Sequence, residues 1–577
     1  MTWKIRDTYR KKLAAEQGYK PATRGGDLSV CLVYPNRYHV GMSNLGFQTV
    51  YRILNGIPGV VCERAFLPEG AELKEYRASG CRLMTLESQR EAGSFDVLAF
   101  SISFEQDYLH LPLIFALAGI PPLALDRDDS LPLVIAGGAA LFLNPEPAAD
   151  FLDMVLLGEA EPSLPNLMTL LSGEDDRAGL REKAAQIPGV YVPSLLTPRY
   201  AADHLAGWAT RGGAPERVPR VWATGGANAP SATAVFTPDT EFGDMALVEV
   251  SRGCPRGCRF CAAGFIYLPF RQQPLEAVLA RVDEGLQLRR KIGLVGAAVS
   301  DYREIGALSL AILDRGGTVS VSSLRIDGID DKMIDVLIKS GHKTVALAPE
   351  GGSQRLRNLI NKGISESQIF EACERLIARN ILNLKLYFII GLPTETDADL
   401  DELTALVRAI RERVVTAAKQ NKRLGEIILS VNPFIPKPFT PFQWCGMNPL
   451  KELERKEVYL RRSFSGVANI KFNMENPREA LLQGFISRGD RRLSGFILKA
   501  HELGNWKKGA KALGLNPEAT AGREIPLEEH LPWDFIESVP KERLVREYRS
   551  AFSKRERMPL SGSPATGTGA PIEAPVS

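Results

Sequence analysis

The sequence predicts an α/β protein in which a doubly wound, Rossmann-like (flavodoxin-like) sheet precedes a partial (β/α)6 barrel of the TIM type. Two patterns predict this fold. Short apolar runs alternate with helical periodicity over residues 27–161, and six further strand–helix units follow over residues 246–431. A mixed, mainly helical region comes after them. A chain of 577 residues is also too long for a single core, so we expect several domains.

Composition places the chain among soluble globular proteins, with 45% hydrophobic and 24% charged residues. The 71 Lys and Arg against 68 Asp and Glu give a net charge of +3, too near neutral to indicate a partner. The N-terminus lacks the apolar core of a signal peptide, and no apolar run reaches the roughly 18 residues of a membrane span. We therefore expect a cytoplasmic protein without membrane insertion.

The first sheet is expected within a domain over residues 1–165. Polar and glycine-rich loops follow its strands, and ligands of such sheets bind at the carboxyl ends of the strands. The loops would therefore line one crevice, or the glycines would serve only tight turns. The Pro-, Gly- and Ala-rich residues 166–240 are interpreted as a connecting segment. The expected strands are 28–34, 95–102, 131–136 and 154–157, and the loops are 38–46, 101–105, 137–138 and 158–159.

The barrel is expected over residues 241–450. Six strands can be counted where eight would close a barrel, so it should be open, with chemistry at the strand ends and packing inside. The expected strands are 246–250, 292–299, 319–321, 344–348, 384–390 and 427–431, with helices at 274–290, 331–340, 366–379 and 398–419.

Residues 451–558 are expected to form a C-terminal accessory domain. Its 22 basic and 16 acidic residues give +6, which fits either contact with RNA or a solvated helical surface. Residues 559–577 have almost nothing to bury and are expected to be a disordered tail.

The strongest chemical signal is a cluster of three cysteines, Cys254, Cys258 and Cys261, directly after the first barrel strand. Three thiolates can hold three irons of a 4Fe-4S cluster and leave the fourth iron without a protein ligand. A structural zinc site or an electron-transfer cluster would need a fourth ligand, and the closest histidines are His204 and His342. The remaining cysteines are expected to be small buried residues: Cys31, Cys62, Cys81, Cys373 and Cys445.

The residues between these cysteines suit a cluster. Gly253 and Gly257 let the backbone fold closely around it. Three arginines can offset the negative charge of thiolates and sulfides, although arginines on a loop are often only solvated. They are Arg252, Arg256 and Arg259.

The Cys-x3-Cys-x2-Cys loop, with Phe260 before its third cysteine and a six-unit barrel behind it, resembles the radical S-adenosylmethionine enzymes. The resemblance implies that the three cysteines bind a 4Fe-4S cluster whose open iron chelates S-adenosylmethionine. It also implies that the backbone around Phe260 lies near the adenine. In this family the reduced cluster cleaves S-adenosylmethionine to methionine and a 5'-deoxyadenosyl radical.

Other strand ends carry further implied contacts. The turn from Gly391 to Glu395 is similar to a Gly-Leu-Pro-Gly-Glu-Thr turn that shapes the S-adenosylmethionine site, or it is only a turn before a helix. Where the family often has Gly-Gly-Glu, this chain offers Ser300 instead. After the third and fourth strands, Arg325 would suit the methionine carboxylate and Glu350 the ribose hydroxyls, unless the two pair with each other.

The N-terminal sheet resembles the cobalamin-binding-like domain of one subgroup of this family. Its implied contacts are Gly41, Ser101, Gly137 and Gly138. The surroundings of His39 lack the subgroup's Asp-x-His-x-x-Gly pattern, so a histidine ligand to cobalt is not expected and cobalamin binding stays open. The overall match is to an uncharacterised family with a distinctive C-terminal region, here residues 487–492 and 532–534.

These implications predict an enzyme that abstracts hydrogen from an unknown substrate, with a reductant such as flavodoxin or ferredoxin as partner. With cobalamin, methyl transfer to an unactivated carbon is expected; without it, another radical reaction. Two alternatives stay open: an RNA-modifying, methylthiotransferase-like enzyme, and a non-catalytic iron–sulfur protein that carries electrons or senses redox state.

Overall fold

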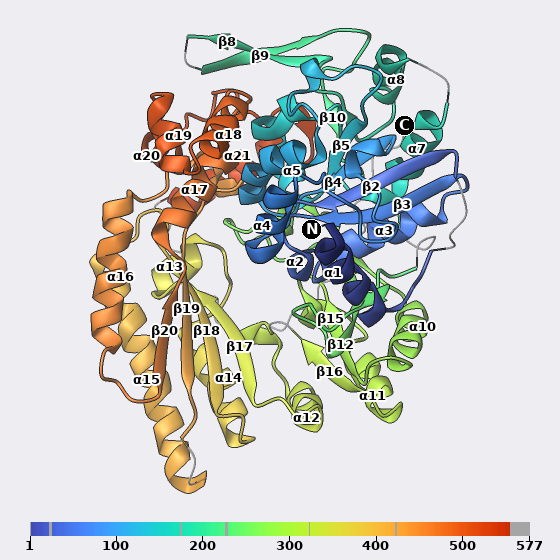
Figure 1. Cartoon of the computed structure of the whole chain (residues 1–577). Coiled ribbons are helices and arrows are strands. Elements are labelled where there is room, and N and C mark those ends of the chain that lie inside the picture. The colour runs from blue at the N-terminus through green and yellow to red at the C-terminus, as the bar shows by residue number, and fades with distance from the viewer. Residues whose placement is uncertain are drawn as a thin grey trace.

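The computed structural model describes residues 2–21, 26–173, 176–202, 204–224, 229–321, 324–421 and 424–553. An N-terminal α/β unit lies at the upper right of Figure 1, two parallel sheets occupy its lower half, and the C-terminal helices gather at the upper left. The expected tail, residues 559–577, lies outside the described residues.

The N-terminal unit is built on a six-stranded sheet with strand order β3-β2-β4-β5-β6-β7. All neighbouring pairs are parallel except β6 and β7. The order of the first five strands is that of a flavodoxin-like, doubly wound sheet, as predicted, and it reverses direction between β2 and β4. The strands are β2 (Leu28–Tyr34), β3 (Val60–Phe66), β4 (Val97–Ser101), β5 (Leu133–Gly137), β6 (Met154–Leu156) and β7 (Val190–Tyr191).

Strand β3 was not expected, because Glu63 and Arg64 interrupt its apolar run. The structure shows why these residues are tolerated. Arg64 is buried and forms ion pairs with Glu16, at 2.7 Å, and Glu87, at 2.6 Å. A buried charge with partners on two sides can take a place in a central layer that otherwise needs an apolar side chain.

The second half contains seven parallel strands in two sheets, β12-β15-β16 and β17-β18-β19-β20. An isolated parallel bridge between Leu324 and Leu347 links the sheets, which over the described residues do not close into a barrel. The six predicted strands are present, and β20 adds a seventh from the segment expected to be accessory. The strands are β12 (Met245–Glu249), β15 (Lys291–Val295), β16 (Thr318–Val321), β17 (Thr344–Glu350), β18 (Asn383–Ile390), β19 (Ile427–Pro433) and β20 (Ile470–Met474).

Helices cover the outer faces of these two sheets. Their amphipathic faces pack into the cores formed with the strands. Four of them occupy the expected stretches. The helices are α10 (Leu275–Leu286), α11 (Ile305–Asp314), α12 (Asp331–Lys339), α14 (Glu366–Ala378) and α15 (Asp397–Asn421).

Most of the C-terminal helices share one hydrophobic core with the N-terminal unit, whereas Leu460 and Phe464 of the first of them belong to a core of the second half. The sequence 487–492 forms part of this joint. Arg491 binds buried Glu146 through two hydrogen bonds of 3.0 and 3.1 Å, and Asn144 donates to the carbonyl oxygens of Ser487 and Gly489. The helices are α16 (Leu450–Phe464), α17 (Pro477–Ser487), α18 (Leu493–Glu502), α19 (Trp506–Ala512), α20 (Pro517–Gly522) and α21 (Lys541–Phe552).

The connecting segment is partly regular. Strands β8 (Leu196–Ala201) and β9 (His204–Thr210) form a hairpin at the top of Figure 1, and β11 (Val235–Phe236) pairs with β1 (Gln17–Gly18). In the described part of the chain, every helix is either too short or too polar to cross a membrane.

The buried pair of Arg491 and Glu146 should matter for stability. Replacing Glu146 with Ala leaves a buried guanidinium without its carboxylate, which costs about 3–5 kcal/mol. We expect this loss in the free energy of unfolding, measured by denaturant titration. Replacing Arg461, which pairs with Glu457 on the exposed face of α16, should cost about 0.5 kcal/mol or less. Equal losses in the two variants would contradict a structural role for the joint.

Candidate functional site

The three cysteines lie on one irregular loop, residues 253–270, which we call the cluster loop. It begins after β13 (Ser251–Arg252) and ends at β14 (Arg271–Gln272), and these two short strands pair antiparallel. Gly253 has φ +82°, and a Cβ there would lie 2.4 Å from the carbonyl oxygen of Tyr267. Only glycine fits where the two arms of the loop approach so closely.

The cysteines are close enough for their charges to interact. The backbone N–H of Cys261 donates to the carbonyl of Cys258 at 3.0 Å, and each of the three thiols feels the others electrostatically. Burial raises the pKa of Cys258, and burial followed by the charge of Cys258 raises that of Cys261 to about 11. Free of metal, Cys258 and Cys261 therefore favour the protonated thiol, and a bound cation would reverse that preference.

The donor set fits an iron–sulfur cluster better than a single ion. Among the described residues, no three His, Cys, Asp or Glu side chains are grouped as one metal ion requires. Ligands around one tetrahedral zinc lie roughly 4 Å apart. Each thiolate of a cubic cluster binds a different iron, so the three thiols of one loop need not converge on a single ion.

The three predicted arginines, Arg252 in β13 and two within the loop, are all paired with carboxylates. Arg252 binds Glu249, Glu159 and Glu161, and Arg256 binds Asp301. Arg259 is buried, donates to the carbonyl of Leu359 at 2.8 Å, and pairs with Glu547 of α21 at 3.2 Å. The arginines therefore tie the cluster loop to three separate parts of the fold.

Two predicted contacts lie beside Cys258. Arg325 forms two hydrogen bonds of 2.9 and 3.0 Å with Asp327, and Glu350 pairs with Lys362 at 3.4 Å. Both Arg325 and Glu350 act electrostatically on the Cys258 thiol. They do not pair with each other, so each has a partner of its own next to the loop.

The remaining barrel predictions fare differently. Ser300 lies in a short 3-10 turn, Val299–Asp301, whose Asp301 is occupied by Arg256. Glu395 is buried, accepts the backbone N–H of Gly391 at 2.7 Å and pairs with Lys456 of α16 at 2.7 Å. This arrangement closes the Gly391 turn on itself, and neither residue lines the two cavities described next.

A smaller cavity of about 480 Å³ opens at the carboxyl ends of β17, β18 and β19. It brings Phe260 of the cluster loop together with Glu350, as a shared binding site requires. Tyr387 and Phe434 add aromatic surface, and further polar groups come from Asn432, near the end of β19, and Lys437, which follows it.

A larger cavity of about 640 Å³ lies between the carboxyl edge of the N-terminal sheet and the first strands of the barrel. Predicted residues Ser101, Gly137 and Gly138 line it, and Gly253 and Gly296 line it from the barrel side. Gly41 does not: it packs in helix α2 (Tyr38–Met42), where a Cβ would lie 2.6 Å from the ring of Phe66.

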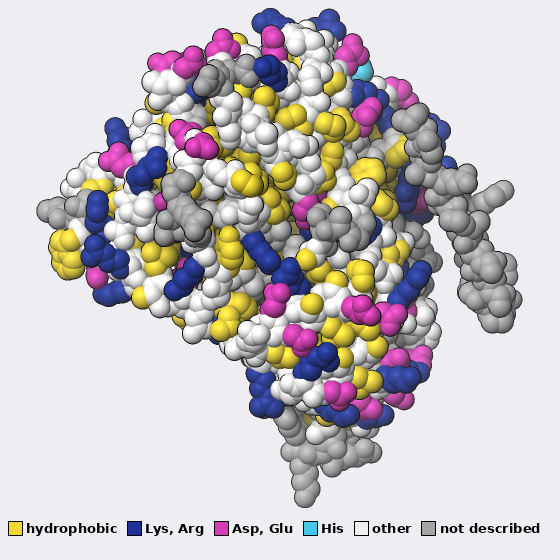
Figure 2. All heavy atoms as spheres, turned by 90° about the vertical axis from the view of Figure 1, so that its right-hand side faces the viewer, with side chains coloured by type: hydrophobic (Ala, Val, Ile, Leu, Met, Phe, Trp, Pro, Cys, Tyr) yellow, Lys and Arg dark blue, Asp and Glu magenta, His cyan; other side chains and the backbone are white. Residues whose placement is uncertain are grey.

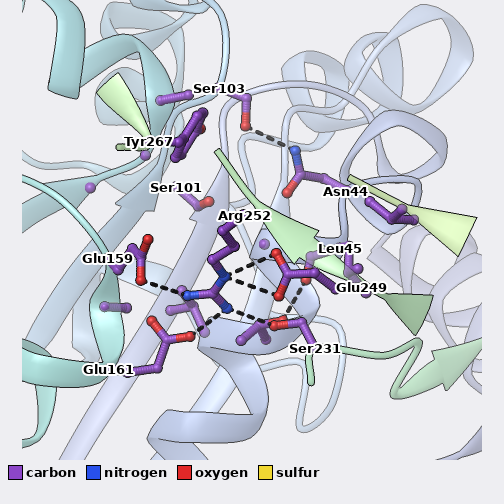
Figure 3. A pocket seen from close by; sticks show the side chains of 18 of the residues that line it. Asn44, Leu45, Ser101, Ser103, Glu159, Glu161, Ser231, Glu249, Arg252 and Tyr267 are labelled. Atoms are coloured by element: carbon purple, nitrogen blue, oxygen red, sulfur yellow. Dashed lines mark hydrogen bonds and ion pairs between the residues drawn. The ribbon is translucent and has the colours of Figure 1, made fainter. Parts of the chain in front are cut away.

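The wall of the larger cavity is mainly apolar with a few polar groups (Figure 3). Asn44 donates to Ser103 at 2.9 Å, and Arg252 lies among Glu159, Glu161 and Glu249. Ser251 is buried, and its hydroxyl finds no hydrogen-bond partner among the described residues. Such a hydroxyl on a cavity wall is suited to a ligand's polar group.

His39 is placed away from this cavity. Its ring nitrogens face Asp239, at 3.1 Å, and Glu241, at 3.2 Å, and it lines a separate cavity of about 410 Å³.

Sequence reasoning placed Glu159 in a loop of the crevice, but it missed Arg271 and the pairing of Glu159 with arginines. Glu159 follows β6 at the same sheet edge as the predicted loops, and its carboxylate accepts hydrogen bonds from Arg252 and Arg271. Its position after a strand was a usable signal, but the arginines that it binds lie 93 and 112 residues away in the sequence.

Comparison with known proteins identifies two matching families. Residues 46–193 match "Radical SAM proteins, N-terminal", and residues 248–407 match the "Radical SAM superfamily". An uncharacterised protein of Methanocaldococcus jannaschii is 28% identical over 479 residues, which cover 81% of this chain and 90% of that protein.

Two further similarities are partial. The tRNA-2-methylthio-N(6)-dimethylallyladenosine synthase of Cereibacter sphaeroides is 29% identical over 35% of this chain, which spans 48% of that enzyme. The cobalamin-dependent S-adenosylmethionine radical enzyme OxsB, solved with aqua-cobalamin and S-adenosylmethionine, has a TM-score of 0.41 and 16% identity over 66% of this chain and 51% of its own. A structural similarity at this level does not determine which ligands this chain binds.

The two glycines at the end of β5 should respond differently to substitution. Gly138 has φ +120°, and a Cβ there would lie 2.3 Å from the carbonyl oxygen of Ile102, whereas the nearest atom to a Cβ at Gly137 is 3.7 Å away. We expect Gly138→Ala to lower the free energy of unfolding by about 1–3 kcal/mol, and Gly137→Ala to change it by about 0.5 kcal/mol or less. Denaturant titration of the two variants tests this, and equal stability would contradict the described sheet edge.

Proposed function

Because this chain belongs to the radical S-adenosylmethionine superfamily, we propose that it is an enzyme that holds a 4Fe-4S cluster on Cys254, Cys258 and Cys261. The observation that supports this most is that three cysteines share one loop after the first barrel strand, and that two other residues of this loop, Gly253 and Phe260, line the larger and the smaller cavity. When bound, such a cluster supplies the electron that cleaves S-adenosylmethionine and so generates a radical that abstracts hydrogen from a substrate.

The chain's own residues would hold S-adenosylmethionine beside the loop. The smaller cavity offers Phe260 and Tyr387 as apolar surface for a nucleoside base and Glu350 as an acceptor for ribose hydroxyls. Arg325 lies within electrostatic range of Cys258 and would offset a carboxylate there. In the same proposal, Ser300, Gly391 and Glu395 support the S-adenosylmethionine site from neighbouring strand ends.

The larger cavity would take cobalamin or the substrate itself. Its sheet edge presents neutral polar groups, Asn44, Ser101 and Ser103, with the backbone of Gly137 and Gly138. It also lies beside the point where the strand order reverses, the usual ligand position in doubly wound sheets. Neutral hydrogen-bonding groups in an apolar wall suit a large ligand that carries amides and hydroxyls. With cobalamin bound we propose methyl transfer, and without it another radical reaction.

The optical spectrum of the anaerobically purified protein separates these cases. Cobalamin and the iron–sulfur cluster absorb differently, so one spectrum reports on each. We propose a cytoplasmic setting and a one-electron reductant such as flavodoxin or ferredoxin as partner, because the cluster must be reduced before S-adenosylmethionine is cleaved.

Serine variants of the three cysteines test the proposal directly. Each should lose most of the iron and sulfide that the wild type gains on anaerobic reconstitution, since serine is a poor ligand for iron in such a cluster. With dithionite and S-adenosylmethionine, the wild type should form 5'-deoxyadenosine and the variants should not. Cys81→Ser, in the N-terminal unit, is the matched control and should behave as wild type. A wild-type protein that loads a cluster but forms no 5'-deoxyadenosine would be an electron carrier or redox sensor.

A substrate in RNA is the second candidate, favoured by the partial similarity to tRNA methylthiotransferases. On the face drawn in Figure 2, acidic and basic side chains are intermixed. If RNA binds, its retention should weaken steeply as salt is raised, because phosphate contacts release counterions. Filter binding between low and physiological salt measures this, and no retention at low salt would remove this candidate.

A further inference from the structure

The two ends of the cluster loop meet on one carboxylate from the N-terminal unit. In the β13–β14 pair, Arg252 lies opposite Arg271, so the two ends of the cluster loop are adjacent. Arg252 donates to Glu159 Oε2 at 2.8 Å, and Arg271 donates to the same oxygen at 2.9 Å and to Oε1 as well. One side chain therefore spans the base of the loop.

Glu159 is itself held firmly. It follows β6 with only 7% of its surface exposed, and its Oε2 also accepts the backbone N–H of Ala223 at 2.8 Å. Burial alone would raise its pKa, but the hydrogen bonds from Arg271 and the charge of Arg252 outweigh burial and leave the pKa below its usual value. The carboxylate is therefore ionised and fixed in place.

A third arginine supports the same end of the loop. Buried Arg220 donates to the carbonyl of Leu268 at 3.0 Å and to Ser538 at 2.9 Å, and it lies within electrostatic range of Glu159. Arg220 of the connecting segment thus links Leu268, near the C-terminal end of the cluster loop, to Ser538 of the C-terminal region. These contacts lie close to Glu159.

Glu161 provides the natural contrast. It pairs with Arg252 at 2.6 Å, and among the described contacts Arg271 pairs with Glu159 and not with Glu161. Glu249 likewise pairs with Arg252, at 2.9 Å. Arg252 therefore keeps two carboxylates when Glu161 is neutralised, and the two ends of the loop stay joined through Glu159.

We propose that Glu159 is a positioning residue that joins the two ends of the cluster loop and thereby holds Cys254, Cys258 and Cys261 ready for the cluster. The inference rests on the proposed function for the identity of the cluster, but the anchoring itself concerns only this chain's residues. A buried carboxylate shared by two guanidinium groups is strong enough for this, because charge-assisted hydrogen bonds are about twice as strong as neutral ones.

The test compares Glu159→Gln with the wild type in the metal-free protein. The amide keeps the size of the side chain but leaves Arg252 and Arg271, whose side chains are 17% and 18% exposed, without a shared negative charge, so the loop should open more often. We expect Cys254, Cys258 and Cys261 to be alkylated roughly tenfold faster, the change that corresponds to about 1.4 kcal/mol. The alkylation of Cys81 should not change and serves as the internal control for global unfolding. Mass spectrometry of each cysteine peptide gives the rates.

Two further variants make the result specific. Arg271→Gln releases one end of the loop while Arg252 still neutralises Glu159, so it should expose the three cysteines in the same direction. Glu161→Gln should leave their protection close to that of the wild type. After anaerobic reconstitution, Glu159→Gln should bind less iron than the wild type, and the electron paramagnetic resonance spectrum of its reduced cluster should be altered.

Each outcome decides one point. Alkylation, iron content and spectrum unchanged in Glu159→Gln would overturn the inference, as would equal effects in Glu159→Gln and Glu161→Gln. If fast alkylation of Cys81 shows that Glu159→Gln is unfolded, the test uses Arg271→Gln instead. Unchanged alkylation of Cys254, Cys258 and Cys261 in Arg271→Gln would then overturn the inference. A wild-type protein that gains no cluster would contradict the proposed function. The alkylation rates of the metal-free variants would still test whether Glu159 holds the loop.

Discussion

The site depends on pairing between the arginines of the cluster loop and carboxylates elsewhere in the chain. The loop has little regular structure of its own, with only the short helix α9 (Ala263–Ile266) inside it. An irregular loop has few internal contacts to offset the entropy lost when it is ordered. Ion pairs with other parts of the fold order this loop instead: Arg252 pairs with the N-terminal unit, Arg256 with Asp301, and Arg259 with α21.

The same pairs explain why the N-terminal unit and the barrel form one site. The carboxyl edge of the N-terminal sheet and residues of β12 and β15 line the larger cavity together, with Gly138 and Gly253 on its two sides. Parallel sheets place their loops at the carboxyl ends of the strands, so the polar loops of the N-terminal sheet gather around this space. The C-terminal helices hold this arrangement through Arg491 and Glu146.

Sequence patterns predicted the strands well wherever the apolar run was unbroken, as in β2 and β18. They failed at β3, because the partners that make Arg64 acceptable inside lie far along the chain. The cysteines and Phe260 could be found because their spacing is local. The role of Glu159 could not, since it depends on two arginines brought together by the β13–β14 pair. Glu395 was selected by a local motif, yet Lys456, a partner from α16, turned it inward.

Glu159 lies on the wall of the larger cavity as well as at the base of the cluster loop. Any molecule that settles against that wall then acts on the same carboxylate that governs the loop. Two equilibria that share one group are thermodynamically reciprocal. If the loop binds iron as proposed and a molecule in the cavity strengthens that binding by some factor, iron must strengthen the binding of that molecule by the same factor, and the order in which the two bind leaves the final complex unchanged.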